Sequence, residues 1–167
     1  MWLLIVMYLS AIVVANISVA AFGPAVSIVN AFVFIALDLT SRDRLHEAWH
    51  GRGLAWKMVA LIAAGSALSY VINRNAGPIA LASFVAFGVS ATLDTLVYAI
   101  LEPKSYGLRV NGSNIVSAAA DSLIFPALAF GLPLLWPIVI GQFIAKVIGG
   151  AIWSIVLQQR ITRKASL

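Results

Sequence analysis

A few ionisable and amide side chains stand inside long apolar stretches of this 167-residue chain. Such groups are costly in hydrocarbon, so they usually face the interior of a helix bundle or a wet cavity. Their chemistry is recognition, because carboxylates, an ammonium and amides exchange hydrogen bonds with a polar solute. We therefore predict a polar binding site built from Asn16, Asn30, Asp94, Asn114, Ser117, Asp121, Gln142 and Lys146, with Asp38 as a gating or coupling residue.

The spacing of these residues places several of them on shared helical faces. Asn114, Ser117 and Asp121 follow one another at i, i+3 and i+7, and Gln142 and Lys146 at i and i+4. At about 1.5 Å per residue, both Asp121 and Lys146 fall near the middle of a membrane. We expect these two charges to pair, which would neutralise both.

Two further faces are readable in the same way. Ser83, Phe87, Ser90 and Asp94 share one face of a helix, while Gly141, Ala145 and Gly149 form a stripe of small residues that allows close helix packing. Phe34, Phe87 or Trp153 could stack on a flat solute. Ser66 and Ser69 we assign to structural bonds with backbone carbonyls one turn back.

The elements that carry these residues are apolar stretches of membrane-spanning length. The chain is 62% hydrophobic and 10% charged, against about 45–50% and about 25% for soluble domains. It has no cysteine, which excludes a disulfide scaffold and thiolate chemistry. We predict an all-α integral membrane protein with one transmembrane domain over residues 1–167 and six helices at about 2–21, 24–40, 54–72, 76–101, 113–131 and 133–158.

Charge placement supports this count and gives an orientation. Lys and Arg gather in cytoplasmic loops, and with both termini cytoplasmic only Arg74 falls on the outer side. The inner side then holds nine basic residues, Arg42, Arg44, Arg52, Lys57, Lys104, Arg109, Arg160, Arg163 and Lys164. Short turns at Gly23-Pro24 and at Gly131 to Pro133 predict antiparallel neighbours, although the second could instead be a kink in a re-entrant segment.

Other functions fit the sequence poorly. His46 and His50 at i and i+4 could bind a metal, but no third ligand lies nearby, so we expect no metal and no cofactor. The charged loop around them fits an interfacial helix better than an enzyme acting on lipid phosphates, and we expect no catalysis. The net charge of +5 suits an anionic inner leaflet and requires no nucleic acid.

Several separated motifs resemble one known family. They are the region of Asn16, Phe-Ile-Ala-Leu-Asp-Leu-Thr at 34–40, Ala-Ser-Phe at 82–84, Leu-Asp at 93–94, Ser-Asn-Ile-Val-Ser-Ala-Ala-Ala-Asp-Ser at 113–122, and Lys146. Over most of its length the chain resembles the queuosine-precursor transporters, also known as the vitamin uptake transporter (VUT) family. Where that family commonly has Gln or Asn between the serine and the aspartate, this chain has Ala118.

The resemblance implies a multi-pass importer of the bacterial inner membrane, similar in fold to the six-helix substrate-binding subunits of energy-coupling-factor importers. Its solute would be 7-cyano-7-deazaguanine or 7-aminomethyl-7-deazaguanine. Asp121 and Asp94 would accept hydrogen bonds from the ring N–H and amine, and the Asn and Gln amides would read the carbonyl. The alternative is a binding subunit that needs a separate energising partner; a homodimer and the energy source are left open.

Overall fold

Helices make up nearly all of the structure, a computed structural model that describes residues 2–34 and 54–165. Asp38, His46 and His50 lie outside the described residues. The helices are α1 (Trp2–Phe22), α3 (Leu54–Ile72), the short 3-10 helix η1 (Arg74–Ala76), α4 (Gly77–Ile100), α5 (Tyr106–Phe130) and α6 (Trp136–Ala165). A further helical segment covers residues 26–34. No strand occurs in these described ranges.

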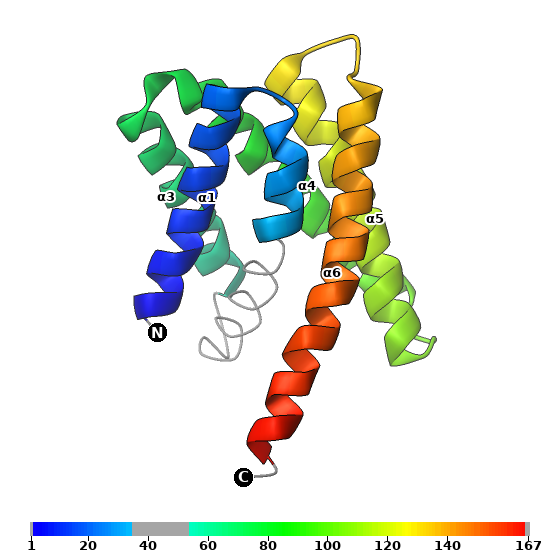
Figure 1. Cartoon of the computed structure of the whole chain (residues 1–167). Coiled ribbons are helices and arrows are strands. Elements are labelled where there is room, and N and C mark those ends of the chain that lie inside the picture. The colour runs from blue at the N-terminus through cyan, green and yellow to red at the C-terminus, as the bar shows by residue number, and fades with distance from the viewer. Residues whose placement is uncertain (1, 35–53, 166–167) are drawn as a thin grey trace.

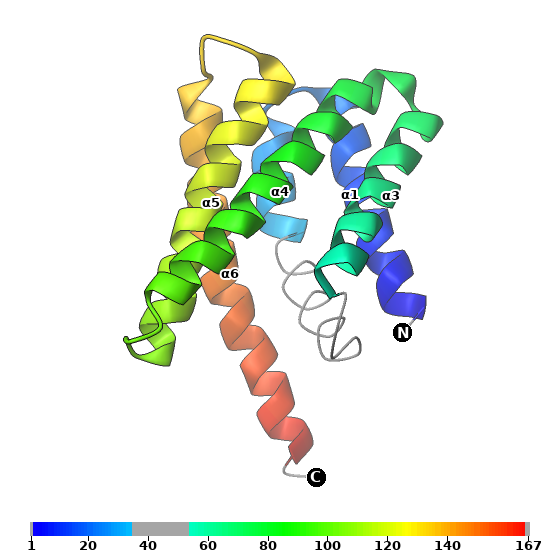
Figure 2. The same ribbon diagram turned by 180° about the vertical axis from the view of Figure 1, so that it is seen from behind.

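The helices run up and down in turn, so consecutive elements are antiparallel (Figure 1). α4 packs most extensively on α5, while α1 packs on α3, α3 on α4 and α5 on α6. Seen from behind, α4 and α5 cross one side of the bundle and α1 and α3 form the other (Figure 2). The start of α1, the α4–α5 connection and the end of α6 lie at the same end of the bundle (Figure 1).

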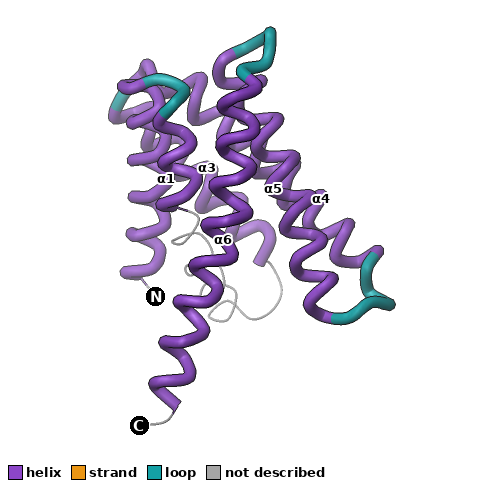
Figure 3. Tube along the Cα trace, turned by 45° about the vertical axis from the view of Figure 1, so that its right-hand side comes forward, coloured by secondary structure: helices purple, strands orange, loops and turns teal. Residues whose placement is uncertain are grey.

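Glycine makes two of the turns at the opposite end. Gly23 and Gly131 have φ of 83° and 80°, a conformation that residues with a Cβ rarely adopt. Each also closes the preceding helix, because its N–H donates to the carbonyl four residues back, Val19 or Ala127. The chain therefore reverses at Gly131, and α6 returns alongside α5, as expected for a turn rather than a kink (Figure 3).

Helix ends differ from the ends of the apolar stretches. α5 begins at Tyr106, seven residues before the predicted span, because the helix continues through the polar residues Arg109 and Asn111. α6 begins at Trp136, later than predicted, with Pro137 in its first turn, where a missing N–H costs nothing. Hydropathy locates the part of a helix that suits lipid, whereas backbone hydrogen bonding extends beyond it.

The bundle is held together by apolar contacts and by small residues. Tyr8, Met58, Leu61 and Ile62 form a buried cluster between α1 and α3. In α3, a Cβ on Gly65 would lie only 2.9 Å from Cγ2 of Ile12, so these helices approach closely because the glycine has no side chain. The predicted small-residue stripe also packs closely, since a Cβ on Gly141 would lie 2.5 Å from Cδ1 of Ile28.

The outer surface is apolar. Large hydrophobic side chains such as Trp2, Phe22, Trp56 and Ile100 are exposed, while polar residues such as Asn16 and Gln142 are buried. Three stretches are long and apolar enough to cross a membrane, Ile5–Phe22, Arg74–Ile100 and Asn111–Phe130, and the shorter apolar helices Trp56–Ile72 and Trp136–Gly150 stand beside them. Apolar side chains outside and polar side chains inside suit a protein that is surrounded by lipid. The count of six spans and their orientation stay predictions.

Replacing Gly65 with alanine should destabilise the bundle, whereas Gly88→Ala should not. Nothing lies within 4 Å of a Cβ at Gly88, so that variant only gains helix propensity. Overpacking typically costs about 1–3 kcal/mol. Thermal unfolding in detergent should therefore give Gly65→Ala the lower melting temperature of the two. Equal melting temperatures would contradict a close α1–α3 contact.

Candidate functional site

A cavity of about 540 Å³ opens inside the bundle. Residues of α1, segment 26–34, α3, α4, α5 and α6 line it. Its polar lining consists of Asn16, Ser27, Asn30, Ser83, Ser90, Asn111, Asn114, Ser117, Asp121, Gln142 and Lys146. A volume of this size is typical of small-molecule sites, so the cavity is the candidate functional site.

Helix α5 contributes a polar stripe to the cavity. Asn111, Asn114, Ser117 and Asp121 recur every three or four residues and all line it. Within the described chain, neither Asn114 nor Ser117 has a side-chain hydrogen bond to another residue. Both groups are therefore available to a solute. Ala118, which the resemblance marked as a departure, also lines the cavity and leaves an apolar patch within this stripe.

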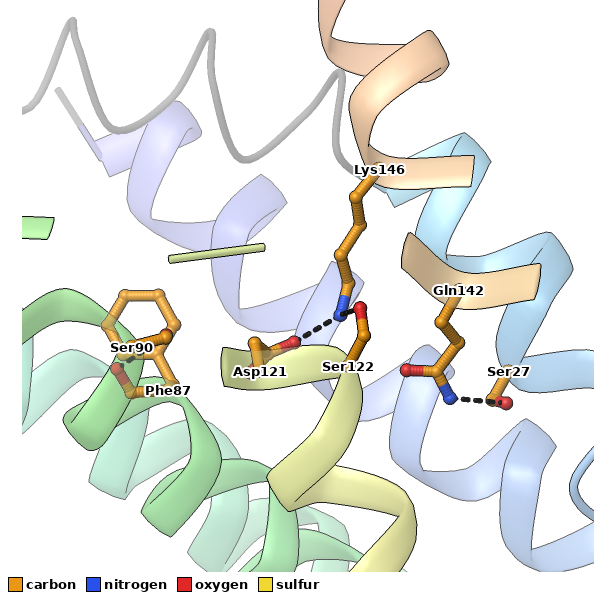
Figure 4. A network of polar contacts seen from close by, with 7 residues as sticks. All are labelled: Ser27, Phe87, Ser90, Asp121, Ser122, Gln142 and Lys146. Atoms are coloured by element: carbon orange, nitrogen blue, oxygen red, sulfur yellow. Dashed lines mark hydrogen bonds and ion pairs between the residues drawn. The ribbon is translucent and has the colours of Figure 1, made fainter. Parts of the chain in front are cut away.

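An ion pair joins α5 to α6 at the cavity wall. The Nζ of Lys146 donates to Oδ2 of Asp121 and, at 3.1 Å, to the hydroxyl of Ser122 (Figure 4). The expected pairing is therefore confirmed. The two side chains are 15% and 27% exposed, so both are partly shielded from solvent. Oδ1 of Asp121 has no hydrogen-bond partner among the described residues and is the carboxylate oxygen left to a solute.

Three buried or half-buried amides line the other walls. Asn16 of α1 donates to Ser69 at 3.1 Å, and Asn30 of segment 26–34 donates to Ser18 at 2.8 Å. Gln142 of α6 donates to Ser27 at 2.8 Å, one helical turn from Lys146 (Figure 4). Each bond connects two different helices, so the amides both line the cavity and tie its walls together.

Aromatic rings complete the lining. Phe34 and Phe87, both expected to stack on a flat solute, line the cavity, as do Tyr8 and Phe125. The side chain of Trp153 lies outside the described residues. Phe87 stands on α4 beside Ser90, whose hydroxyl donates to the Phe87 carbonyl at 3.0 Å (Figure 4). The cavity thus has apolar faces between its polar groups.

The structure brings together all but one of the predicted binding residues. Asn16, Asn30, Asn114, Ser117, Asp121, Gln142 and Lys146 line the cavity. Asp94 does not, although Ser83 and Ser90 on its helix do. Asp94 lies one turn beyond Ser90 at the spacing of the same helical face, so the shared spacing did not suffice to place it in the lining.

Sequence reasoning missed several contributors. The predicted span at 113–131 leaves out Asn111, yet this residue precedes Asn114 by three and extends the same periodicity by one turn. The hydroxyl of Ser69 donates to the Gly65 carbonyl at 2.8 Å, as expected. It also accepts a hydrogen bond from the side-chain amide of Asn16. The hydroxyl of Ser66, in contrast, is buried without a hydrogen-bond partner in the described chain. No local pattern marked Ser27 as the partner of Gln142, 115 residues away.

The described residues contain no group of three His, Cys, Asp or Glu side chains that could hold an ion. What the lining can do chemically is hold a polar molecule by hydrogen bonds inside an apolar bundle.

The chain is similar to a family of known proteins. The profile of a family described as "putative vitamin uptake transporter" matches residues 2–158. That range includes every residue that lines the cavity. No curated protein and no solved structure matches the chain.

Removing one partner of the ion pair should destabilise the bundle more than removing both charges. Lys146→Met leaves a carboxylate without its counter-charge, a change that costs about 3–5 kcal/mol in a fully buried pair and less in this partly exposed one. The double variant Lys146→Met with Asp121→Asn removes both charges and should recover much of this loss. Thermal unfolding of the parent and both variants in detergent checks the order. A double variant less stable than Lys146→Met would contradict it.

Proposed function

Because the chain belongs to the putative vitamin uptake transporter family, we propose that it imports a queuosine precursor through the central cavity. The family is one of transporters, and the apolar helices suit a multi-pass membrane protein. The observation that carries the proposal is the polar cavity within a bundle whose outer surface is apolar. A transporter needs such a site, because a polar solute must exchange its hydration for protein hydrogen bonds before it crosses hydrocarbon.

The lining supports a flat, nitrogen-rich heterocycle as the solute. The phenyl rings of Phe34 and Phe87 offer faces for stacking, which favours planar molecules. Asp121 offers a carboxylate oxygen, and the Asn114 amide can both donate and accept. A deazaguanine has a planar ring, several N–H groups and one carbonyl. We propose that Asp121 accepts from its N–H groups; Asp94, which lies outside the lining, has no part in this contact.

The ion pair has a second consequence for the empty cavity. Lys146 keeps the Asp121 carboxylate compensated when no solute is present, so the site costs little to maintain in a membrane. We propose that the solute enters and leaves by alternating access in the inner membrane of a bacterium, with both termini of the chain on the cytoplasmic side.

Uptake of labelled 7-cyano-7-deazaguanine tests the proposal. Cells that lack the precursor and any coupling module should accumulate the label when they express the parent chain. Asp121→Asn should reduce uptake at least tenfold, because the substituted amide loses the anionic acceptor. Thr92→Ala is the control, since Thr92 is exposed, bonds only to its own helix at the Gly88 carbonyl and lies outside the cavity lining.

A binding measurement on purified protein separates the outcomes. A bound solute stabilises the folded state by about 2.7 kcal/mol at 100 times its Kd, so the melting temperature of the parent should rise. Binding without uptake would identify a binding subunit that needs an energising partner. Neither binding nor uptake would contradict the proposed function.

The neutral cyano compound should bind more tightly than its aminomethyl relative. Among the described lining residues the only formal charges are Asp121 and Lys146, which compensate each other. A protonated amine would add an uncompensated charge in a medium of low dielectric constant. We expect at least a tenfold difference in Kd from thermal-shift titrations at neutral pH. Tighter binding of the aminomethyl compound would contradict the argument.

A further inference from the structure

Three amide side chains in the cavity lining share one arrangement. The nitrogens of Asn16, Asn30 and Gln142 donate to the hydroxyls of Ser69, Ser18 and Ser27, at 3.1, 2.8 and 2.8 Å. The three amides come from three different elements, α1, segment 26–34 and α6. A contact that recurs on three walls of one cavity calls for a common explanation.

Each of these serines is also a donor. The hydroxyl of Ser69 donates to the Gly65 carbonyl at 2.8 Å and that of Ser18 to the Ala15 carbonyl at 3.0 Å. Ser27 donates to the carbonyl of Pro24. A hydroxyl has a single hydrogen, so once it is used the serine can only accept from the amide. The amide must therefore turn its nitrogen toward the serine.

This arrangement determines where the amide oxygens lie. Each oxygen points away from its serine, as Figure 4 shows for Gln142. None of the three accepts a hydrogen bond from a described residue, and none is among the fully buried polar atoms that lack a partner. All three residues line the cavity. Each of the three amide oxygens is thus an acceptor left free on these walls, while Asn16 and Gln142 each also keep one N–H that no described residue accepts.

Asn30 shows this most clearly. Its nitrogen donates to the carbonyl of Ala15 at 3.2 Å as well as to Ser18. Both N–H groups are then used within the protein, and only the oxygen remains for a solute. The expectation that the amides read a carbonyl therefore fails at Asn30, which has no N–H left to offer it.

We propose that Ser18, Ser27 and Ser69 are positioning residues, which orient the oxygens of Asn30, Gln142 and Asn16 to accept from N–H groups of the solute. The inference rests on the proposed function and adds which hydrogen-bonding groups of the solute the site recognises, namely its N–H donors. A site built to accept several N–H groups rejects an analogue that lacks one, because a desolvated acceptor is then left unpaired. Specificity would follow from the serines, although they need not touch the solute.

The test compares Ser27→Ala, Gln142→Leu and the double variant. The ligand is 7-cyano-7-deazaguanine, beside analogues that each lack one N–H group, and Kd is measured by thermal-shift titration in detergent. Ser27→Ala leaves the Gln142 amide in place but free to rotate. We expect about tenfold weaker binding of the parent ligand and a smaller preference over the analogue whose missing N–H faces Gln142. The double variant should bind no more weakly than Gln142→Leu alone.

The controls separate positioning from simple stabilisation. Thr92→Ala removes a hydroxyl that bonds the Gly88 carbonyl but receives no amide in the described chain, and it should leave Kd and ligand preference unchanged. If Ser27→Ala does not fold, Ser18→Ala makes the same test, because it removes the serine that accepts from Asn30 in a less buried pair. A lower melting temperature with unchanged Kd and preference would overturn the inference and leave the proposed function standing. Absence of binding by the parent chain would overturn both.

Discussion

A polar group in the middle of a bilayer must find its partner within the protein, because lipid offers neither donors nor acceptors. The Asp121–Lys146 pair meets this constraint by joining α5 to α6. Both charges lie at the wall of a cavity, and each compensates the other. The pair places α6 together with the bond from Gln142 to Ser27, one turn away. The pair also limits what the cavity accepts, since any added charge would stand uncompensated.

The same constraint explains why the serines matter. A buried amide carries donors and an acceptor, and leaving either unpaired is costly. Asn16, Asn30 and Gln142 satisfy N–H groups across helix interfaces and keep their oxygens at the cavity. In each amide, the nitrogen therefore has the structural role and the oxygen has the proposed role in recognition. A bundle tied by such bonds holds its helices in place while its cavity stays polar.

Close approach of the helices is the second requirement. Gly65 and Gly141 bring Ile12 and Ile28 within contact distance of a neighbouring backbone. Only at such distances can a side chain as short as serine bond an amide on another helix. Packing by small residues and pairing of polar residues thus act together: the first sets the spacing that the second needs.

Periodicity alone predicts much of this site. Asn114, Ser117 and Asp121 share a helical face by their spacing, and the short Gly131 turn makes α5 and α6 neighbours, so the Asp121–Lys146 pair is predictable from local rules. Asp94 shows the limit of the same rules, because it has the helical spacing of Ser83 and Ser90 and yet lies outside the cavity lining. Asn111 shows another, since hydropathy marks the lipid boundary and not the start of a helix.

The sequence by itself determined that the chain suits apolar surroundings, that it is helical and which helical faces carry polar residues. These properties follow from composition and from a period of 3.6 residues. Only the tertiary structure decided which serine meets which amide. Ser27 and Gln142 are 115 residues apart and Asn16 and Ser69 are 53 apart, and no local spacing encodes a contact between helices. The direction of each amide oxygen, and so the kind of group that the cavity can read, depends on these distant partners.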